Sequence, residues 1–161
     1  MTGLCNIYLL LLFVMSFFAI FGVNMFAGYS YRACRSTEEL IYGDDDIPYW
    51  PKAEVDRLCN SDEMCQVMQS GTFCGSLWET YDLNPRKYDQ VFDNELIFYG
   101  IPGFDNFLQA FVTVFQICTL EGWSYLMYNY LDSSDYPIVV YIFFPLCIIT
   151  GSFFVLNLIL A

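Results

Sequence analysis

Two long apolar segments without a single charged residue lie near the two ends of the chain, over residues 4–27 and 137–161. As α-helices that rise about 1.5 Å per residue, each would extend roughly 36 Å, enough to cross a hydrocarbon core of about 30 Å with some tilt. The pattern therefore predicts two transmembrane helices. A chain that crosses the membrane twice has both termini on one side and the intervening segment on the other.

The segment after the first span, residues 28–102, is a polar loop rich in turn-forming residues, with fourteen acidic and six basic side chains. Clustered cysteines in such a loop favour two disulfides on the oxidising side of a membrane, with three pairings open. This places the loop outside the cell and both termini on the cytoplasmic side. A zinc site is the alternative, although the chain has no His and no C-x-x-C pair. The predicted disulfide cysteines are Cys34, Cys59, Cys65 and Cys74.

A shorter apolar helix is predicted over 104–118, with Gly103 and Asp105 at its start. At about 15 residues it is too short to span a bilayer. It leads into the polar turn T-L-E-G-W at 119–123 and a second short aromatic segment at 124–131. Helix, turn and helix between two spans predict a re-entrant loop, because irregular backbone at membrane depth must be buried in protein or line water. The apolar stripe of the first helix is Phe104, Phe107, Leu108, Phe111, Phe115 and Cys118, and the polar stripe is Asn106, Gln109, Thr113 and Gln116.

Glu121 is the residue of this turn that most needs a physical explanation. Fifteen uncharged residues separate it from Asp105. A carboxylate at membrane depth is costly unless it faces water or a cation, so such acids are functional-site candidates. The preceding helix would direct its partly negative end toward the turn, and the carbonyls of Thr119 and Leu120 would add oxygen ligands. We therefore predict a cation site that symmetry-related partners complete, because calcium takes about six to eight oxygens. The alternative is that Glu121 caps the second short helix near the surface.

The amino-acid composition excludes some classes of function for this chain. Of 161 residues, 57% are hydrophobic and 20% aromatic, with a mean hydropathy of +0.43 and a net charge of −12. The six basic residues lie between Arg32 and Lys87, which excludes a basic nucleic-acid-binding surface. The absence of His removes the commonest general base, so we predict that the chain is not an enzyme.

The acidic residues of the loop are expected to form a solvated surface that concentrates cations near the membrane, together with Asp132 and Asp135. The run at Asp44, Asp45 and Asp46 belongs to this surface, because it lacks the ligand spacing of a calcium-binding loop.

Two stretches make the sequence specific: FDNFLQAFVTVFQICTLEGWS, which begins at Phe104, and TGSFFVLNLILA, which ends the chain. They resemble the pore region of the voltage-gated calcium and sodium channel superfamily, and the resemblance covers the whole chain. It implies an all-α membrane protein in which two transmembrane helices flank a re-entrant pore-helix, filter and pore-helix loop, with a long disulfide-bonded extracellular turret. The implied domains are an outer pore helix at 1–27, the turret at 28–102, the pore loop at 103–131 with the selectivity filter at 119–123, and a linker with a truncated pore-lining helix at 132–161.

The resemblance also implies roles for the turn. Glu121 would be one of four filter carboxylates that bind the permeant metal ion, with carbonyl oxygens of Thr119 and Leu120 beside it. Gly122 and Trp123 would support the filter, the indole N–H of Trp123 donating to a Thr of a neighbouring repeat. The alternative for Trp123 is an interfacial aromatic residue.

Two further residues belong to the implied pore-lining helix. Gly151 would be its flexible point, and Asn157 would make a polar contact between helices. The alternative for Gly151 is a glycine that only permits close helix packing.

The function implied is the pore-forming segment of a voltage-gated cation channel that selects calcium, most like the first repeat of a four-repeat calcium channel. A sodium or non-selective cation channel repeat is the alternative within the superfamily, because the other three filter residues lie outside this chain. A non-conducting two-span surface protein with a disulfide-stapled ectodomain is the alternative from another class.

The implied partners are three homologous pore repeats, in the same polypeptide or as subunits of a tetramer, together with voltage-sensor segments, auxiliary subunits and the lipid bilayer. No cofactor is expected besides permeant Ca²⁺ at the filter. We expect a multi-pass protein of the cell membrane. Because Met1 stands almost directly at the first span, we also expect a segment excised from a larger polypeptide.

Overall fold

The computed structural model describes residues 2–42, 48–54, 57–81 and 102–160. The acidic run at Asp44, Asp45 and Asp46 and the loop residues 82–101 lie outside the described residues. The chain divides into two compact units. The helical unit comprises Met1–Ala27, Pro102–Tyr128 and Tyr136–Ala161, and the loop unit comprises Gly28–Ile101 and Asn129–Asp135.

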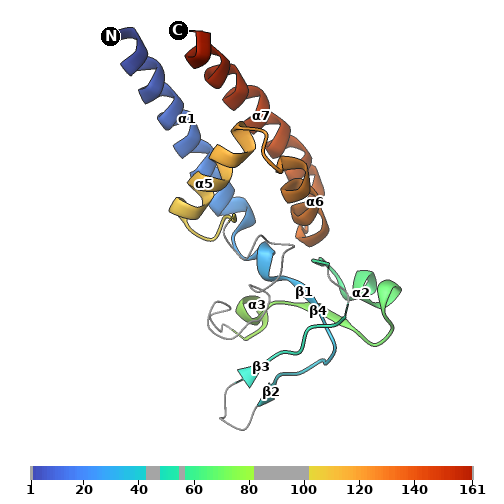
Figure 1. Cartoon of the computed structure of the whole chain (residues 1–161). Coiled ribbons are helices and arrows are strands. Elements are labelled where there is room, and N and C mark those ends of the chain that lie inside the picture. Colours follow the sequence, from blue (N-terminus) through green and yellow to red (C-terminus); the bar gives the residue numbers. More distant parts are fainter. Residues whose placement is uncertain (1, 43–47, 55–56, 82–101, 161) are drawn as a thin grey trace. The chain divides into compact units, whose positions relative to one another are not determined.

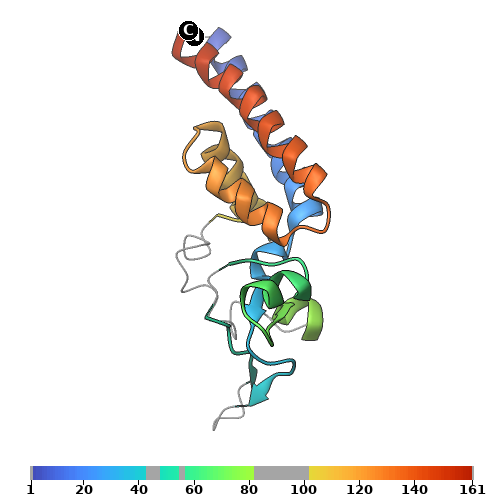
Figure 2. The ribbon, with the colours of Figure 1, turned by 90° about the vertical axis from the view of Figure 1, so that its right-hand side faces the viewer.

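The helical unit is built from α1 (Thr2–Phe26), α5 (Phe107–Cys118), the first part of α6 (Trp123–Ser133) and α7 (Pro137–Leu160). Helices α1 and α7 contain no charged residue and are apolar on all sides, as helices surrounded by hydrocarbon are. Among the described residues one helical stretch, Cys5–Phe26, is long and apolar enough to cross a membrane by itself, and the described apolar part of α7 is Pro137–Phe153. The chain ends carried by α1 and α7 lie at the same end of this unit (Figure 1, Figure 2).

An aromatic cluster joins α1, α7 and the residues before α5. The ring of Phe104 is fully buried, with its centroid 5.4 Å from that of Phe26 in α1 and 5.6 Å from that of Phe143 in α7. The rings of Phe26 and Phe143 are in turn 5.1 Å apart. A Cβ on Gly22 of α1 would collide with the ring of Phe104, so the glycine makes room for it. Such aromatic pairs contribute roughly 0.5–1.5 kcal/mol each beyond area burial.

Helix α5 begins at Phe107, three residues after the predicted start at Phe104. The N-cap is Asn106, whose side-chain oxygen accepts a 2.9 Å hydrogen bond from the N–H of Gln109. The prediction that Gly103 and Asp105 start the helix was therefore wrong, because Asn106 satisfies the first free N–H groups instead. The N–H of Gly103 donates to the hydroxyl of Thr113 at 2.7 Å, which folds the preceding residues back onto the helix.

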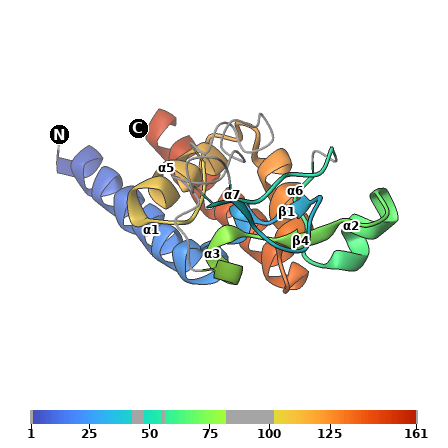
Figure 3. The same cartoon turned by 90° about the horizontal axis from the view of Figure 1, so that it is seen from below.

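The buried face of α5 consists of small and β-branched side chains together with the last residue. The helix packs against α1 and α7, and its ribbon lies beside that of α1 in Figure 3. Half of the predicted apolar stripe faces outward instead, since Phe107, Leu108 and Phe115 are 44%, 75% and 54% exposed. Small residues let helix backbones approach closely, whereas large apolar side chains are tolerated on a surface that faces lipid. The buried residues of α5 are Ala110, Thr113, Val114, Ile117 and Cys118.

The loop unit contains short elements. They are η1 (Tyr29–Tyr31), β1 (Ala33–Arg35), β2 (Ile41–Tyr42), β3 (Pro48–Tyr49), α2 (Asp62–Met68), β4 (Phe73–Gly75) and α3 (Leu77–Tyr81). Strand β1 pairs antiparallel with β4, and β2 with β3. These strands correct the expectation of an all-α chain, although most of the described elements are helical. Strands of two or three residues are too short to show a readable alternation of polar and apolar positions.

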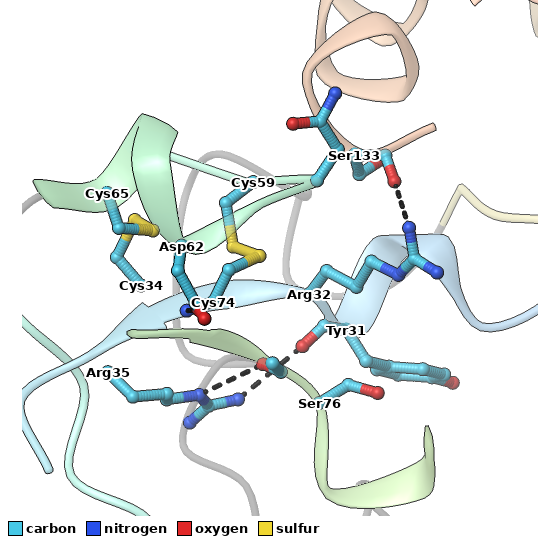
Figure 4. The surroundings of a disulfide bond; sticks show 12 residues. Tyr31, Arg32, Cys34, Arg35, Cys59, Asp62, Cys65, Cys74, Ser76 and Ser133 are labelled. Atoms are coloured by element: carbon cyan, nitrogen blue, oxygen red, sulfur yellow. Dashed lines mark hydrogen bonds between the residues drawn. A yellow bond between two sulfur atoms is a disulfide. The ribbon is translucent and has the colours of Figure 1, made fainter. Parts of the chain in front are cut away.

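The four loop cysteines form two disulfides, Cys34–Cys65 and Cys59–Cys74 (Figure 4). Cys34 of β1 lies opposite Cys74 of β4, so the bonds fasten α2 and the residues before it to this strand pair. The sulfurs of Cys34, Cys59 and Cys65 lie within 4.8 Å of one another. Because these sulfurs are all in disulfides, they are not thiolate ligands, and the zinc alternative is not supported.

Arg35 of β1 is fully buried and links separate segments of the loop unit. Its guanidinium donates to the carbonyl oxygens of Trp50, Gly75 and Tyr31 at 3.0, 3.3 and 3.4 Å, two of which are drawn in Figure 4. It also lies 5.3 Å from the centre of the Trp50 ring. A buried charge is tolerated only with such hydrogen bonds, so Arg35 specifies how these segments meet.

Candidate functional site

The candidate site is the turn at 119–122, which joins α5 to α6 in Figure 1. Thr119 is the C-cap of α5 and keeps a helical conformation. Leu120 and Gly122 both have positive φ, 64° and 62°. Leu120 is the only non-glycine residue with positive φ in the described part of the chain.

The hydrogen bonds of the turn form a Schellman motif. The N–H of Leu120 donates to the carbonyl of Ile117 at 3.1 Å, and the N–H of Glu121 donates to that of Gln116 at 3.2 Å. The motif usually has glycine where this chain has Leu120, because the left-handed conformation costs other residues about 1–2 kcal/mol. The turn thus holds a strained residue next to the carboxylate of Glu121.

Oxygen atoms on this turn remain available for a ligand. Glu121 is exposed, and its carboxylate has no hydrogen bond or ion pair among the residues that the structure describes. The carbonyls of Thr119 and Leu120 likewise accept no hydrogen bond from any described residue. The three predicted ligand residues therefore lie on one turn, beside the partly negative end of α5.

Helix α6 starts directly after the turn, with the N–H of Leu126 donating to the carbonyl of Gly122 at 3.2 Å. The alternative that Glu121 caps this helix requires its carboxylate to accept such an N–H, and the described residues provide no such bond. Trp123, the first residue of α6, is half-buried, and its indole N–H has no acceptor within the described ranges. That N–H is available to a group outside this chain.

Gly151 and Asn157 both lie in α7. Gly151 is buried and faces Cys118, the last residue of α5. Gly151 therefore contacts the residue that directly precedes the turn and not the turn itself. The side chain of Asn157 lies outside what the structure describes. The contact at Gly151 could not be read from spacing, because 33 positions separate it from Cys118 in the sequence.

Two acidic residues, one in the last turn of α6 and one just after this helix, are ion-paired. Asp132 accepts two hydrogen bonds from Arg57, at 2.6 and 2.7 Å, and Asp135 accepts two from Arg32, at 2.8 and 3.0 Å. The Arg32 guanidinium lowers the pKa of Asp135 below its usual value, and the hydrogen bonds that Arg57 donates to Asp132 raise the pKa of Arg57. The predicted surplus of negative charge at these two residues is therefore compensated by arginines from distant parts of the sequence.

The family model described as "Ion transport protein" matches residues 1–161. The chain is 34% identical over 163 aligned positions to the mouse voltage-dependent L-type calcium channel subunit alpha-1C. It is 38% identical over 160 positions to the rat voltage-dependent P/Q-type calcium channel subunit alpha-1A.

Each alignment covers 99% of this chain but 6% of the relative, so the chain spans a small part of the relatives' length. The relatives are subunits of ion channels, in agreement with the prediction that the chain is not an enzyme. The resemblance to the calcium and sodium channel superfamily is likewise confirmed. Because the family model matches every residue, the chain belongs to the ion transport protein family.

Proposed function

We propose that the chain is the pore module of one repeat of a voltage-gated, calcium-selective cation channel in the cell membrane. In this proposal α1 and α7 both span the bilayer, α5 and α6 form a re-entrant loop, and the loop unit is extracellular. Three homologous repeats complete the pore, and voltage sensors and auxiliary subunits lie outside the chain. Calcium-channel relatives at 34% and 38% identity support calcium over sodium.

The observation that carries the proposal is the carboxylate of Glu121 on the turn at 119–122, which has no partner among the described residues. This turn follows an apolar helix of 12 residues, which is too short to cross a membrane. A carboxylate in such a place needs water or a cation. A ring of four such modules around an axis supplies both.

Electrostatics explains why such a ring would select a divalent ion. Two unit charges about 4 Å apart interact by about 4 kcal/mol at an effective dielectric of about 20. Each carboxylate therefore attracts Ca²⁺ about twice as strongly as Na⁺ at the same distance. Carbonyls of Thr119 and Leu120 would form neighbouring, weaker sites, which let a second ion enter and displace the first.

The test uses the full-length channel that contains this segment. With Glu121→Gln, the Ca²⁺ concentration that half-blocks Na⁺ current should rise roughly ten- to hundredfold, since a fraction of the estimated Coulomb energy already gives that factor. The matched control is Glu63→Gln, which removes an exposed acid from the first turn of α2 in the loop unit. This control should leave calcium block unchanged.

If Glu121→Gln channels retained wild-type block and wild-type calcium-over-sodium selectivity, the proposed filter role would be wrong. The non-conducting alternative is tested by Leu120→Cys in the same channel. Protection of this thiol by Cd²⁺ and block of current by a small thiol reagent support a pore. A modified thiol without any change in current contradicts one.

A further inference from the structure

Gly151 of α7 lies against the end of the helix that precedes the candidate filter. A Cβ built on Gly151 would collide with Cys118 Sγ, would lie 2.8 Å from Cys118 Cβ and would lie 3.4 Å from Cys118 Cα. The same sulfur is 3.9 Å from the carbonyl oxygen of Cys147, one turn earlier on α7. Cys118 therefore sits in a notch that Gly151 leaves open in α7.

Rotation of the cysteine side chain does not remove this restriction. A different rotamer moves Sγ, but Cβ is fixed to the backbone, and real Cβ contacts essentially never come as close as 2.8 Å. Any side chain at position 151 thus requires α5 and α7 to move apart. Interiors are close-packed, with Cys118 itself 5% exposed and Ile117 fully buried, so the displacement passes to the backbone that follows.

The next residue along the chain is Thr119, the first of the predicted ligand residues. Glycine in a helix interior costs about 1 kcal/mol relative to alanine, so its place in the middle of α7 needs a packing or functional reason. We propose that Gly151 is a positioning residue that seats Cys118 on α7 and thereby sets where the turn at 119–122 is held. This rests on the proposed filter function of Glu121 and assigns Gly151 a role other than a flexible hinge.

The proposal is tested in the full-length channel with variants that move the glycine of this contact from α7 to α5. Gly151→Ala should raise the half-blocking Ca²⁺ concentration on the order of tenfold, because ion sites require ligand placement within about 0.5 Å. Cys118→Gly removes both the Cβ and the Sγ that the new methyl group would meet. The double variant should therefore return calcium block toward the wild-type value. Cys118→Gly alone empties the notch without forcing the helices apart, so it should shift calcium block less than Gly151→Ala does.

A control distinguishes positioning from packing in general. Gly22 of α1 is also closely approached, by the ring of Phe104, so Gly22→Ala should lower the thermal stability of the channel like Gly151→Ala. It should not change the half-blocking Ca²⁺ concentration. If Gly22→Ala shifted calcium block as much as Gly151→Ala, the role of Gly151 would be merely structural.

A role of Gly151 as a flexible hinge predicts a different result from its role in making room for Cys118. If flexibility were the function, Gly151→Ala would alter opening and closing, and Cys118→Gly would not restore wild-type behaviour, which overturns the proposal. Failure of the underlying function is recognised separately, by wild-type calcium block in Glu121→Gln. In that case restored thermal stability in the double variant would still support the seat between Cys118 and Gly151, and its absence would overturn it.

Discussion

Arg57 and Asp132 form a two-pronged ion pair in the loop unit, with nitrogen–oxygen distances of 2.6 and 2.7 Å. The pair is a small dipole rather than a net charge, so it adds little to the field that would attract cations. Its two members are 75 positions apart. The expectation that Asp132 contributes an uncompensated negative charge is therefore wrong, because Arg57 neutralises this charge.

Single substitutions in this pair should change cation conductance in opposite directions. Arg57→Gln exposes the carboxylate of Asp132 and should raise single-channel conductance at low salt, whereas Asp132→Asn should lower it. The double variant should lie close to the wild type, because it removes a neutral pair. The measurement is conductance at about 10 mM ionic strength, where charges act over about 30 Å, and again at about 1 M, where the differences should vanish.

The same direction of change in both single variants would mean that the pair acts through structure and not through its charge.

A second pair, Arg32 with Asp135, gives a prediction about pH. Because Arg32 lowers the pKa of Asp135 below its usual 3.8, the folded loop unit binds a proton there less readily than the unfolded chain does. The stability that this pair contributes is complete above about pH 5, and it is lost as the pH falls from there through the lowered pKa. Asp135 is 46% exposed, so solvent screening limits the contribution to about 1 kcal/mol or less.

Hydrogen exchange in the full-length channel checks this prediction. After correction for intrinsic rates, amide protection of the peptide that covers 129–135 should be equal at pH 7.4 and pH 5. Arg32→Gln should reduce protection at both values, since it also removes the hydrogen bonds to Glu79 at 2.8 and 2.9 Å. A wild-type loss of protection between these two pH values would contradict a lowered pKa of Asp135.

Much of the helical framework could be predicted from the sequence, for identifiable reasons. A charge-free apolar run predicts a long helix whatever its neighbours, and α1 and α7 lie within two residues of the predicted limits. Glu121 stood out because one charge in an apolar stretch needs an explanation. The start of α5 was placed too early because helical spacing continues through Phe104, whereas the cap at Asn106 decides where the helix begins.

Other features depend on contacts that a sequence pattern does not encode. In a helix that is apolar on most sides, hydrophobicity does not reveal which face packs against other helices, so Ala110 and Val114 were missed as buried positions of α5. The choice among three cysteine pairings depends on how β1 meets α2 in space. The positive φ of Leu120 was equally hidden, because that conformation is expected of glycine.

The two disulfides should stabilise the loop unit to different extents. They close loops with sequence separations of 15 and 31 residues, for which loop entropy gives about 3 and 4 kcal/mol. The loops interleave, because Cys59 lies between Cys34 and Cys65, so the two contributions should not add. We expect Cys34→Ser with Cys65→Ser to reduce channel density at the cell surface more than Cys59→Ser with Cys74→Ser.

Surface labelling of intact cells measures this density, and protease added outside measures how open the loop unit has become. The control is Cys5→Ser, which removes an exposed free cysteine of α1 and should change neither quantity. Equal densities for the wild type and both double variants would mean that the disulfides are not needed to fold the loop unit.

Leu120 offers a way to separate backbone strain from side-chain chemistry at the proposed filter. Leu120→Ala removes most of the side chain but keeps a Cβ in the left-handed conformation, so the strain of the turn remains. Leu120→Gly removes the same side chain and the strain together. Since only the carbonyl of Leu120 is proposed to meet the ion, Leu120→Ala should retain calcium-over-sodium selectivity in reversal-potential measurements.

Leu120→Gly should differ from Leu120→Ala in a defined direction. Glycine adopts φ of 64° without penalty, which should stabilise the Schellman turn by up to about 1 kcal/mol and slow exchange of the Glu121 amide that donates to Gln116. Because the turn is then held more firmly in the same conformation, calcium-over-sodium selectivity should be at least as high as in Leu120→Ala. If Leu120→Ala lost selectivity as fully as Glu121→Gln, the side chain of Leu120, and not its carbonyl, would be the group that the filter uses.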